Sequence, residues 1–382
     1  MRVGLAALFL VLTTLYSGCA PSGLAENETV STASNDTRFK VETVASGLEV
    51  PWAFAWLPDG DMLFTERKGR VRIIEKGRLR PEPVFTVPDV EPTGESGLMD
   101  IALHPDFAKN SFIYLVYSYN SDGKHVKVVR YVVKDLKFAE PKIVIDGIPG
   151  APNHSGSRCR FGPDGKLYVT TGDSTDWELA QKLDSLAGKT LRLNDDGTVP
   201  VDNPFVKTPG ARPEVWTYGN RNAQGIAWQP GSNLIFETEH GPSGFELRGF
   251  GGDEVNILEA GKNYGWPEIH HTQTRDGMVS PLLEYTPSCA PASGMFYTSP
   301  QFPAFNGNFF FGCLAGKRII RVVLDGRKVV RQENLLEGTY GRIREMEQGP
   351  DGYIYFSTSN RDGRGSPAND DDRIMRLVPA KG

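Results

Sequence analysis

The sequence predicts an all-β fold, a six-bladed β-propeller of four-stranded antiparallel blades, from three observations. A strand–turn–strand unit recurs six times along the chain. Turn-forming residues are abundant, with 42 Gly and 27 Pro among 382 residues, which indicates many short elements. Helical patterns are scarce. The best of them, residues 174–193, has apolar residues at near-helical spacing and predicts a short helix in an inserted loop.

The recurring unit is a short apolar strand, a turn built on Pro-Asp or Pro-Gly, and a second apolar strand. Proline sets φ for such a turn, aspartate bonds back to the backbone, and glycine takes the corner with positive φ. About sixty residues per copy leave room for a four-stranded blade and a loop, and closure into a ring protects the sheet edges. A sandwich, or two sandwich domains, does not explain six similar units. The copies are 52–67, 98–118, 158–173, 225–241, 294–322 and 343–360.

The N-terminus has the composition of an export signal. Arg2 precedes an apolar run at 5–15, and small residues follow up to Cys19. We therefore expect residues 1–19 to be a lipoprotein-type signal peptide, with Cys19 as the lipidated first residue of the mature protein; a plain secreted protein is the alternative. Residues 20–37 are expected to be a flexible tether, and 38–380 the propeller catalytic domain. The expected location is periplasmic or membrane-anchored after secretion across the inner membrane, with the lipid on Cys19 as the membrane contact.

Charge and cysteine content exclude some functions and leave others open. A net charge of −5 argues against a surface for nucleic acid or anionic membrane, which would need a basic face. Cys159, Cys289 and Cys313 lack the spacing of a metal site. Cys289 and Cys313 could pair in an oxidising compartment, or both could be free core thiols.

Function in a propeller usually lies on loops at one mouth of the channel. We therefore take as candidate site residues the polar loop residues that no turn requires. His154, in NHSGSR, is either a catalytic base or an innocent loop residue. Arg221 offers a fork of donors for a carboxylate or a developing oxyanion, and a solvated loop arginine is the alternative. Arg342 and Arg344 fall on one strand face at period 2, which favours an anion between them. Together these arginines suggest an anionic small molecule over the channel.

Residues 239–267 form a loop-rich stretch that includes Gly241, Pro242, Glu254 and Tyr264. Ca²⁺ takes carbonyl and carboxylate oxygens from irregular loops of this type, although an ordinary interblade loop would look the same. The acidic tail at 368–377 is interpreted as a solvated closing segment of the last blade.

At these residues the chain resembles the soluble pyrroloquinoline quinone (PQQ) dependent sugar dehydrogenases, the aldose sugar dehydrogenase or soluble glucose dehydrogenase family. The resemblance implies a six-bladed propeller that oxidises an aldose sugar at C1 to the lactone, with PQQ and Ca²⁺ as cofactors and an external electron acceptor. The matching segments run in family order over nearly the whole mature chain: GESGLMDIALHPDF, NHSGSRCRFGPDGKLYVTTGD, TYGNRNAQG, EHGPSG with GGDEVN, KNYGWP and GRIREMEQGPDG.

The same resemblance implies a role for each candidate residue. His154 resembles the general base that removes the proton of the anomeric hydroxyl, and Arg221 and Asn222 resemble the pair beside the quinone's reactive carbonyl. Arg342 and Arg344 resemble the residues that bind the cofactor's carboxylates. Asn153 is grouped with the cofactor-binding residues. For calcium, the residues implied are Gly241 and Pro242 at the catalytic ion and Glu254 and Tyr264 at a second, structural ion.

Three departures from the family pattern bear on function. Glu95 stands where the family has a glutamine near the sugar and cofactor, so a neutral amide becomes a carboxylate. The family's cofactor-binding lysine falls at Ala315, with Lys317 two positions further on and expected on the same strand face. An insertion at 245–250 lengthens the calcium loop. Two other functions therefore stay open: a calcium-dependent lactonase or hydrolase, and a cofactor-free sugar-binding lipoprotein.

Overall fold

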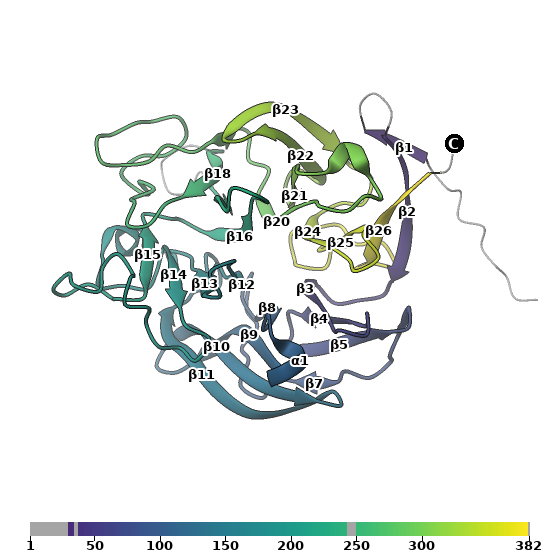
Figure 1. The fold of residues 1–382 in the computed structure, drawn as a ribbon, viewed down its shortest axis with the longest axis horizontal. Coiled ribbons are helices and arrows are strands. Elements are labelled where there is room, and N and C mark those ends of the chain that lie inside the picture. Colours follow the sequence, from purple (N-terminus) through teal and green to yellow (C-terminus); the bar gives the residue numbers. More distant parts are fainter. Residues whose placement is uncertain (1–29, 34–36, 243–249, 381–382) are drawn as a thin grey trace, which may run out of the picture.

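Six antiparallel sheets surround a common axis in the computed structural model, which describes residues 30–33, 37–242 and 250–380 (Figure 1). Each sheet is one blade, and one edge strand of each faces the centre of the ring. The predicted six-bladed β-propeller is therefore confirmed. The inner strands are β3 (Pro51–Trp56), β8 (Leu98–Leu103), β12 (Cys159–Phe161), β16 (Ala223–Trp228), β20 (Pro291–Phe296) and β24 (Ile343–Gln348).

The remaining strands of each blade lie progressively further from the axis. Each of the six predicted strand–turn–strand units contains the first and second strands of one blade, and the unit at 294–322 also extends into the third strand of its blade. The second strands are β4 (Met62–Glu66), β9 (Phe112–Asn120), β13 (Leu167–Thr170), β17 (Ile235–Glu239), β21 (Phe309–Cys313) and β25 (Ile354–Thr358). The third are β5 (Arg70–Glu75), β10 (Lys124–Lys134), β14 (Lys189–Leu193), β18 (Asp253–Leu258), β22 (Arg318–Asp325) and β26 (Ile374–Pro379). The outer strands are β6 (Arg78–Leu79), β7 (Phe85–Thr86), β11 (Lys137–Pro149), β15 (Val215–Tyr218), β19 (Leu283–Tyr285) and β23 (Lys328–Leu335).

The last blade joins the two ends of the chain. Its outer strand is β2 (Thr37–Ala45), which pairs antiparallel with β26 and so closes the ring. A further strand, β1 (Val30–Ala33), pairs with β2. These four residues were predicted to belong to the tether at 20–37; they form a strand because the free edge of β2 offers backbone hydrogen-bonding groups. Residues 1–29, with the predicted signal peptide and Cys19, lie outside the described residues.

The acidic tail at 368–377 is exposed at residues 368–370, as predicted, but the prediction of a solvated segment is wrong for the residues that follow. Asp371 and Asp372 are buried, and β26 lies between β2 and β25. The carboxylate of Asp372 accepts hydrogen bonds from the backbone N–H groups of Val50 at 3.1 Å and Arg361 at 3.2 Å. Backbone N–H groups at the end of the last blade therefore stabilise the buried Asp372 side chain, although the acidic composition of the segment predicted that it would be exposed to solvent.

The predicted helix at 174–193 is wrong over most of its length. Only a 3₁₀-helix, η1 (Trp177–Gln181), forms there, and Lys189–Leu193 is strand β14. The Lys189 ammonium group donates to the carbonyl oxygens of Leu179, Ala180 and Ala187, which ties the loop to the blade in place of further helical turns. The other helical elements described are α1 (Phe107–Asn110) and η2 (Pro303–Phe305).

The three cysteines of the described residues are buried free thiols, so the disulfide alternative for Cys289 and Cys313 does not describe this structure. Burial raises the pKa of the Cys159 thiol well above its ordinary value, which keeps the group protonated. No helix within the described ranges is both long and apolar enough to span a bilayer.

Aromatic contacts join neighbouring blades near the Pro-Asp turns. Trp228 at the end of β16 meets Tyr168 of the preceding blade edge to face, with ring centroids 5.2 Å apart. Trp56 meets Tyr355 in the same way at 5.3 Å. In both tyrosines the hydroxyl donates to the aspartate of the adjacent Pro-Asp-Gly turn, at 3.0 Å for Asp164 and 2.8 Å for the corresponding Asp351. The repeated sequence thus encodes a contact between blades as well as a turn.

Removing this hydroxyl tests the contact. Tyr168→Phe is expected to lower the free energy of unfolding by about 1 kcal/mol, because one net hydrogen bond is lost while the ring contact stays. Urea denaturation of the variant and of the matching Tyr355→Phe measures the effect. Trp228→Ala, which removes the ring contact itself, is expected to cost about 3 kcal/mol. An equally large loss in Tyr168→Phe would contradict the view that the ring contact contributes most of the stability.

A buried ion-pair network fills the centre of the ring below the loops. Arg158, 1% exposed, contacts Asp100 at 3.0 Å and Glu345 at 2.7 Å. Arg160 contacts the same two carboxylates, at 2.6 Å and 3.3 Å. The guanidinium of Arg158 also lies over the Trp52 ring, 4.5 Å from its centroid. These residues come from β3, β8, β12 and β24 or their edges, so the network holds four blades together at the axis.

Candidate active site

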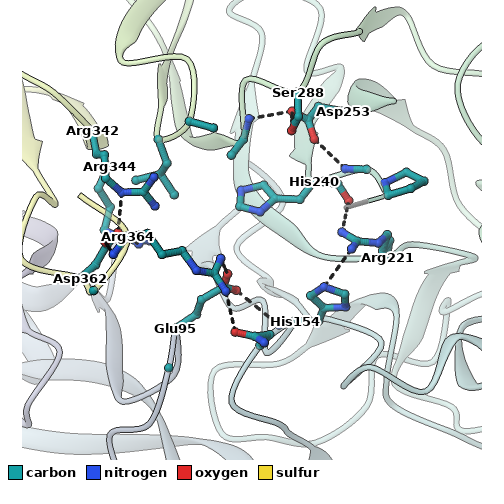
Figure 2. A pocket seen from close by; sticks show the side chains of 18 of the residues that line it. Glu95, His154, Arg221, His240, Asp253, Ser288, Arg342, Arg344, Asp362 and Arg364 are labelled. Carbon is teal, nitrogen blue, oxygen red and sulfur yellow. Dashed lines mark hydrogen bonds and ion pairs between the residues drawn. The ribbon is translucent and has the colours of Figure 1, made fainter. Parts of the chain in front are cut away.

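A cavity of about 540 Å³ lies over the channel, lined by loops that enter the inner strands and by loops between second and third strands (Figure 2). These loops are at the opposite ends of the strands from the Pro-Asp turns. The predicted residues Glu95, Asn153, His154, Arg221, Gly241, Pro242, Arg342 and Arg344 all line it. Arg67 of the first blade and Ala290 of the fifth also line it, so all six blades contribute to one site.

His154 is held by a buried carboxylate. Its Nδ1 lies 2.8 Å from Oδ1 of Asp173, a residue 1% exposed. Oδ2 of Asp173 accepts a hydrogen bond from the indole N–H of Trp266 at 2.8 Å. The carboxylate of Asp173 accepts at this contact, so Nδ1 of His154 carries the proton and Nε2 is the nitrogen that accepts hydrogen bonds. Gly172 is required here, because a Cβ at this position would lie 1.9 Å from the carbonyl oxygen of His154.

Arg221 faces the other side of the histidine ring. Its Nη2 donates to Nε2 of His154 at 2.9 Å, and its Nη1 donates to the carbonyl oxygen of His240 at 3.0 Å. The guanidinium is 5.4 Å from the ring centroid of Trp266. A buried cation thus stands beside the electron pair of a neutral imidazole, which is a suitable place for an oxygen that gains negative charge.

Arg342 and Arg344 share a buried carboxylate that the sequence argument did not identify. Nε of Arg342 lies 2.8 Å and Nη2 of Arg344 3.8 Å from Oδ2 of Asp362. Burial lowers the pKa of Arg344 to about 10. Burial raises the pKa of Asp362, but the charges of Arg344 and Arg342 outweigh it and lower the pKa below its ordinary value. The expected anion between the two arginines exists in the protein itself.

His240 also lines the cavity, beside the predicted Gly241, and Figure 2 shows its ring pointing into the middle of the pocket. Its Nδ1 is 3.5 Å from the amide nitrogen of Asn222, whose Oδ1 accepts from the backbone N–H of Gly156 at 3.1 Å. Asn222 does not line the cavity. Asn222 instead connects the loop of His240 with the loop of Gly156.

Burial of His240 makes stability depend on pH. Burial lowers its pKa to about 4, against 6.5 for the free side chain, so the folded protein keeps the ring neutral while the unfolded chain binds a proton below pH 6.5. In chelator-treated apoprotein, the free energy of unfolding should therefore fall by up to about 3 kcal/mol as pH drops from 6.5 to 4. Urea titrations across this range measure the slope. The slope should be shallower in His240→Gln, and equal slopes in both proteins would refute the prediction.

Lys317 is a predicted cofactor-binding residue that the structure does not bring to the cavity. It is exposed in the turn between β21 and β22, with φ of 50°, whereas Ala315 lines the cavity. The expectation that strand alternation would return Lys317 to the cavity face fails because both residues lie in a turn, where the period-2 rule does not apply.

The candidate calcium ligands fall in two places. Gly241 and Pro242 line the cavity, and the backbone N–H of Gly241 donates to Asp253 at 2.8 Å. Glu254 lies elsewhere, next to the buried Glu239 on β17; burial and the charge of Glu239 raise its pKa well above the ordinary value. The Tyr264 hydroxyl is already engaged, donating to the Ile257 carbonyl at 2.7 Å. Within the described ranges, no three His, Cys, Asp or Glu side chains form a ready metal cage.

The arrangement can now be compared with known proteins. Residues 48–375 match the protein family described as Glucose / Sorbosone dehydrogenase. This chain belongs to that family. The aldose sugar dehydrogenase YliI of Escherichia coli strain K12 is 38% identical to this family member over 343 residues, covering 85% of this chain and 91% of that protein. The quinoprotein glucose dehydrogenase B of Acinetobacter calcoaceticus is 31% identical over 262 residues, which cover 60% of this chain and 53% of that protein.

Solved structures of aldose sugar dehydrogenases share the fold of this glucose/sorbosone dehydrogenase family member. The PQQ-bound form of the Streptomyces coelicolor enzyme superposes with a TM-score of 0.78 at 34% identity, over 90% of this chain and 99% of that one. The apo form of the soluble Escherichia coli enzyme gives a TM-score of 0.80 at 35% identity, over 90% of this chain and 100% of that one. The recognition of the family from its motifs is confirmed, and the chain is a sugar dehydrogenase by family.

The sequence argument missed several site residues, among them Asp173, His240, Asp362 and Arg364. Asp173 ends the quoted segment VTTGD and His240 stands inside EHGPSG, so both were within recognised motifs. Asp362 and Arg364 follow the last predicted repeat unit in a Gly-rich loop. A search for polar residues just after each second strand would have found all four.

Proposed function

We propose that this protein is a PQQ- and calcium-dependent dehydrogenase that oxidises the C1 hydroxyl of aldose sugars to the lactone. The observation that carries the proposal is the pairing of His154 with Asp173 beside Arg221 in the cavity. An imidazole whose Nε2 accepts a hydrogen bond can take the hydroxyl proton as C1 is oxidised. The PQQ-bound relative of the same fold supports the choice of cofactor.

The charge of the cavity fits a flat, polycarboxylate cofactor. Five arginines line it (Arg67, Arg221, Arg342, Arg344 and Arg364) against three acidic residues (Glu95, Asp253 and Asp362). The arginines outnumber the acidic residues by two, and this positive balance favours the carboxylates of PQQ, since arginine binds carboxylates through paired donors. Arg342 and Arg344 are the residues to hold them, with Asp362 keeping both guanidinium groups in place. The loss of a lysine at Ala315 is thus offset by arginines.

Carbonyl and carboxylate oxygens are the ligands that Ca²⁺ prefers, and the chain offers them at both candidate positions. Gly241 and Pro242 are the residues to hold a catalytic ion, which would act there as a Lewis acid. Glu254, with the backbone of Tyr264, is the candidate for the second ion. Near it, Oδ1 of the buried Asn256 has no hydrogen-bond partner among the described residues, which is the state expected of an oxygen reserved for a cation.

The protein's own part in the reaction follows from these contacts. When bound, PQQ supplies the quinone that accepts the hydride of C1 and passes two electrons to an external acceptor. The sugar hydroxyl displaces Arg221 as the donor to Nε2 of His154, and His154 then takes its proton. Asp173 stabilises the imidazolium that results, as in other histidine–aspartate pairs. Arg221, released from Nε2, remains close enough to stabilise an oxygen that becomes negative.

Reconstitution tests this function. Apoprotein incubated with PQQ and CaCl₂ is expected to gain quinone absorbance and to reduce a redox dye when glucose or another aldose is added. The same protein without PQQ is the control, and should do neither. Bound quinone without oxidation of any aldose would refute the sugar substrate. Hydrolysis of a sugar lactone by the quinone-free protein would favour a lactonase instead.

Export and lipidation complete the proposal, with the signal at 1–19 and the acceptor Cys19. Labelled fatty acid fed to expressing bacteria should enter the wild-type protein and not Cys19→Ser, and only the wild type should sediment with membranes. Equal release of both proteins from the periplasm would leave plain secretion as the correct description.

A further inference from the structure

The imidazole of His240 has one ring nitrogen that no group of the described residues engages. His240 is 9% exposed and lines the cavity from the loop between β17 and β18. Its Nε2 atom is buried and has no hydrogen-bond partner within the described ranges. A buried polar group without a partner costs free energy. Because this one stands in the wall of a cavity, its lack of a partner favours a ligand that pairs with it.

The other ring nitrogen fixes the position of the imidazole proton. Oδ1 of Asn222 accepts a hydrogen bond from the backbone N–H of Gly156 at 3.1 Å. The end of this amide that faces His240 is therefore Nδ2, which can only donate, and it lies 3.5 Å from Nδ1 of the ring. Nδ1 must then be the acceptor, so the proton of the neutral imidazole is on Nε2. Nε2 would also carry a proton if the ring were charged, so it is a donor in either state.

Backbone contacts hold this donor in place on both sides. The N–H of His240 donates to the carbonyl oxygen of Asn222 at 3.1 Å. The carbonyl oxygen of His240 accepts from Nη1 of Arg221 at 3.0 Å. The next residue, Gly241, donates its N–H to Asp253 at 2.8 Å. The Nε2–H group is thus preorganised, and a fixed donor shielded from water contributes more to binding than the same donor in solution.

The position of the ring favours the cofactor as the ligand. Figure 2 shows His240 in the middle of the pocket, between Arg344 on one side and Arg221 on the other. Both guanidinium groups are close enough for their charges to act on the ring. A flat molecule held by Arg344 at one end and reaching Arg221 at the other must therefore pass beside the imidazole. Quinone carbonyl and carboxylate oxygens are hydrogen-bond acceptors, which is the partner that Nε2–H lacks.

We propose that Nε2–H of His240 donates a hydrogen bond to an acceptor oxygen of the quinone cofactor and so binds it alongside the arginines. The inference rests on the proposed function and assigns to that site a donor that does not depend on ion pairing. Binding of the cofactor would give the buried donor its partner, which removes the cost of leaving it unpaired. His240 has no part here in taking the proton of the sugar.

Titration of the apoprotein with PQQ at saturating CaCl₂, followed by quenching of tryptophan fluorescence, tests the inference. In His240→Leu the Kd for PQQ should rise about 10-fold or more, because one hydrogen bond to the cofactor is lost. His240→Gln, whose amide keeps an N–H donor, should retain most of the affinity. His125→Leu is the matched control. His125 also has a buried ring nitrogen without a partner among the described residues, but it lies on β10, outside the cavity.

Nuclear magnetic resonance of the wild-type protein gives a readout that needs no turnover. In protein labelled with ¹⁵N-histidine, the signals that disappear in His240→Gln identify this ring among the six histidines. The nitrogen shifts should place its proton on Nε2. Addition of PQQ with CaCl₂ should move the Nε2–H signal. Glucose added without PQQ should leave it in place.

The outcomes separate this inference from the proposed function. A proton on Nδ1, or PQQ binding as tight in His240→Leu as in the wild type, overturns the inference and leaves the dehydrogenase function intact. An Nε2–H signal moved by glucose and not by PQQ also overturns it, since the donor would then serve the sugar. Thermal unfolding of each apoprotein reports folding, and if His240→Leu fails to fold, the wild-type spectra decide. Wild-type protein that binds no PQQ in the presence of Ca²⁺ refutes the proposed function itself.

Discussion

His154→Ala is expected to lower kcat for aldose oxidation by about 10³-fold. The substitution removes the proposed base, an imidazole that contacts Asp173 on one side and Arg221 on the other. Quinone binding should change little, since the arginine pair that would hold the carboxylates is untouched. Stopped-flow measurement of quinone reduction by the sugar isolates the chemical step from reoxidation.

Asp173→Asn tests the role of the supporting carboxylate without changing its shape. An amide can donate to Nδ1 of His154, which would place the proton on Nε2 and remove the free electron pair, so a loss of about 10²-fold or more in kcat is expected. Asp176→Asn is the matched control, three residues further along the same loop and exposed. Full activity of Asp173→Asn would show that the base is another group.

Arg158→Leu is expected to lower the free energy of unfolding by about 3 to 5 kcal/mol, because the buried carboxylates of Asp100 and Glu345 each lose a charged partner. Arg160 cannot neutralise both, since its side chain is 19% exposed and already contacts them at fixed positions. Urea denaturation followed by tryptophan fluorescence measures the change.

A surface pair provides the comparison for this variant. Arg80 and Glu75 pair at 3.0 Å with side chains 42% and 37% exposed, and Arg80→Leu should change the free energy of unfolding by less than about 1 kcal/mol. Similar effects of the two variants would mean that the central network contributes no more than a solvated ion pair.

The architecture was predictable because each blade repeats the same turn chemistry. Proline, aspartate and glycine at fixed offsets between apolar runs are local signals of a strand–turn–strand unit. Six such units in one chain are compatible with few architectures. The helix at 174–193 was mispredicted because Lys189 binds three backbone carbonyls, a tertiary contact that periodicity does not record. Asp372 was assigned to solvent for a similar reason, since one of its partners, Val50, comes from the opposite end of the chain.

The site was predictable where a residue type is unusual for its position, as with His154, Arg221 and the period-2 arginines. Asp362 and Arg364 were not, because their roles depend on partners more than 15 positions away that only the ring brings close. Lys317 shows the converse error. A rule for strands was applied to two residues that lie in a turn.

Closure of the last blade by β2 has a consequence for when the proposed cofactor could bind. The cavity takes residues from the first blade to the last, and the last blade is complete only when the N-terminal strand lies beside the final strand of the chain. A chain that lacks either end cannot bring the opposed arginines and the histidine together in this arrangement. Under the proposed function, quinone binding would therefore report completion of the ring.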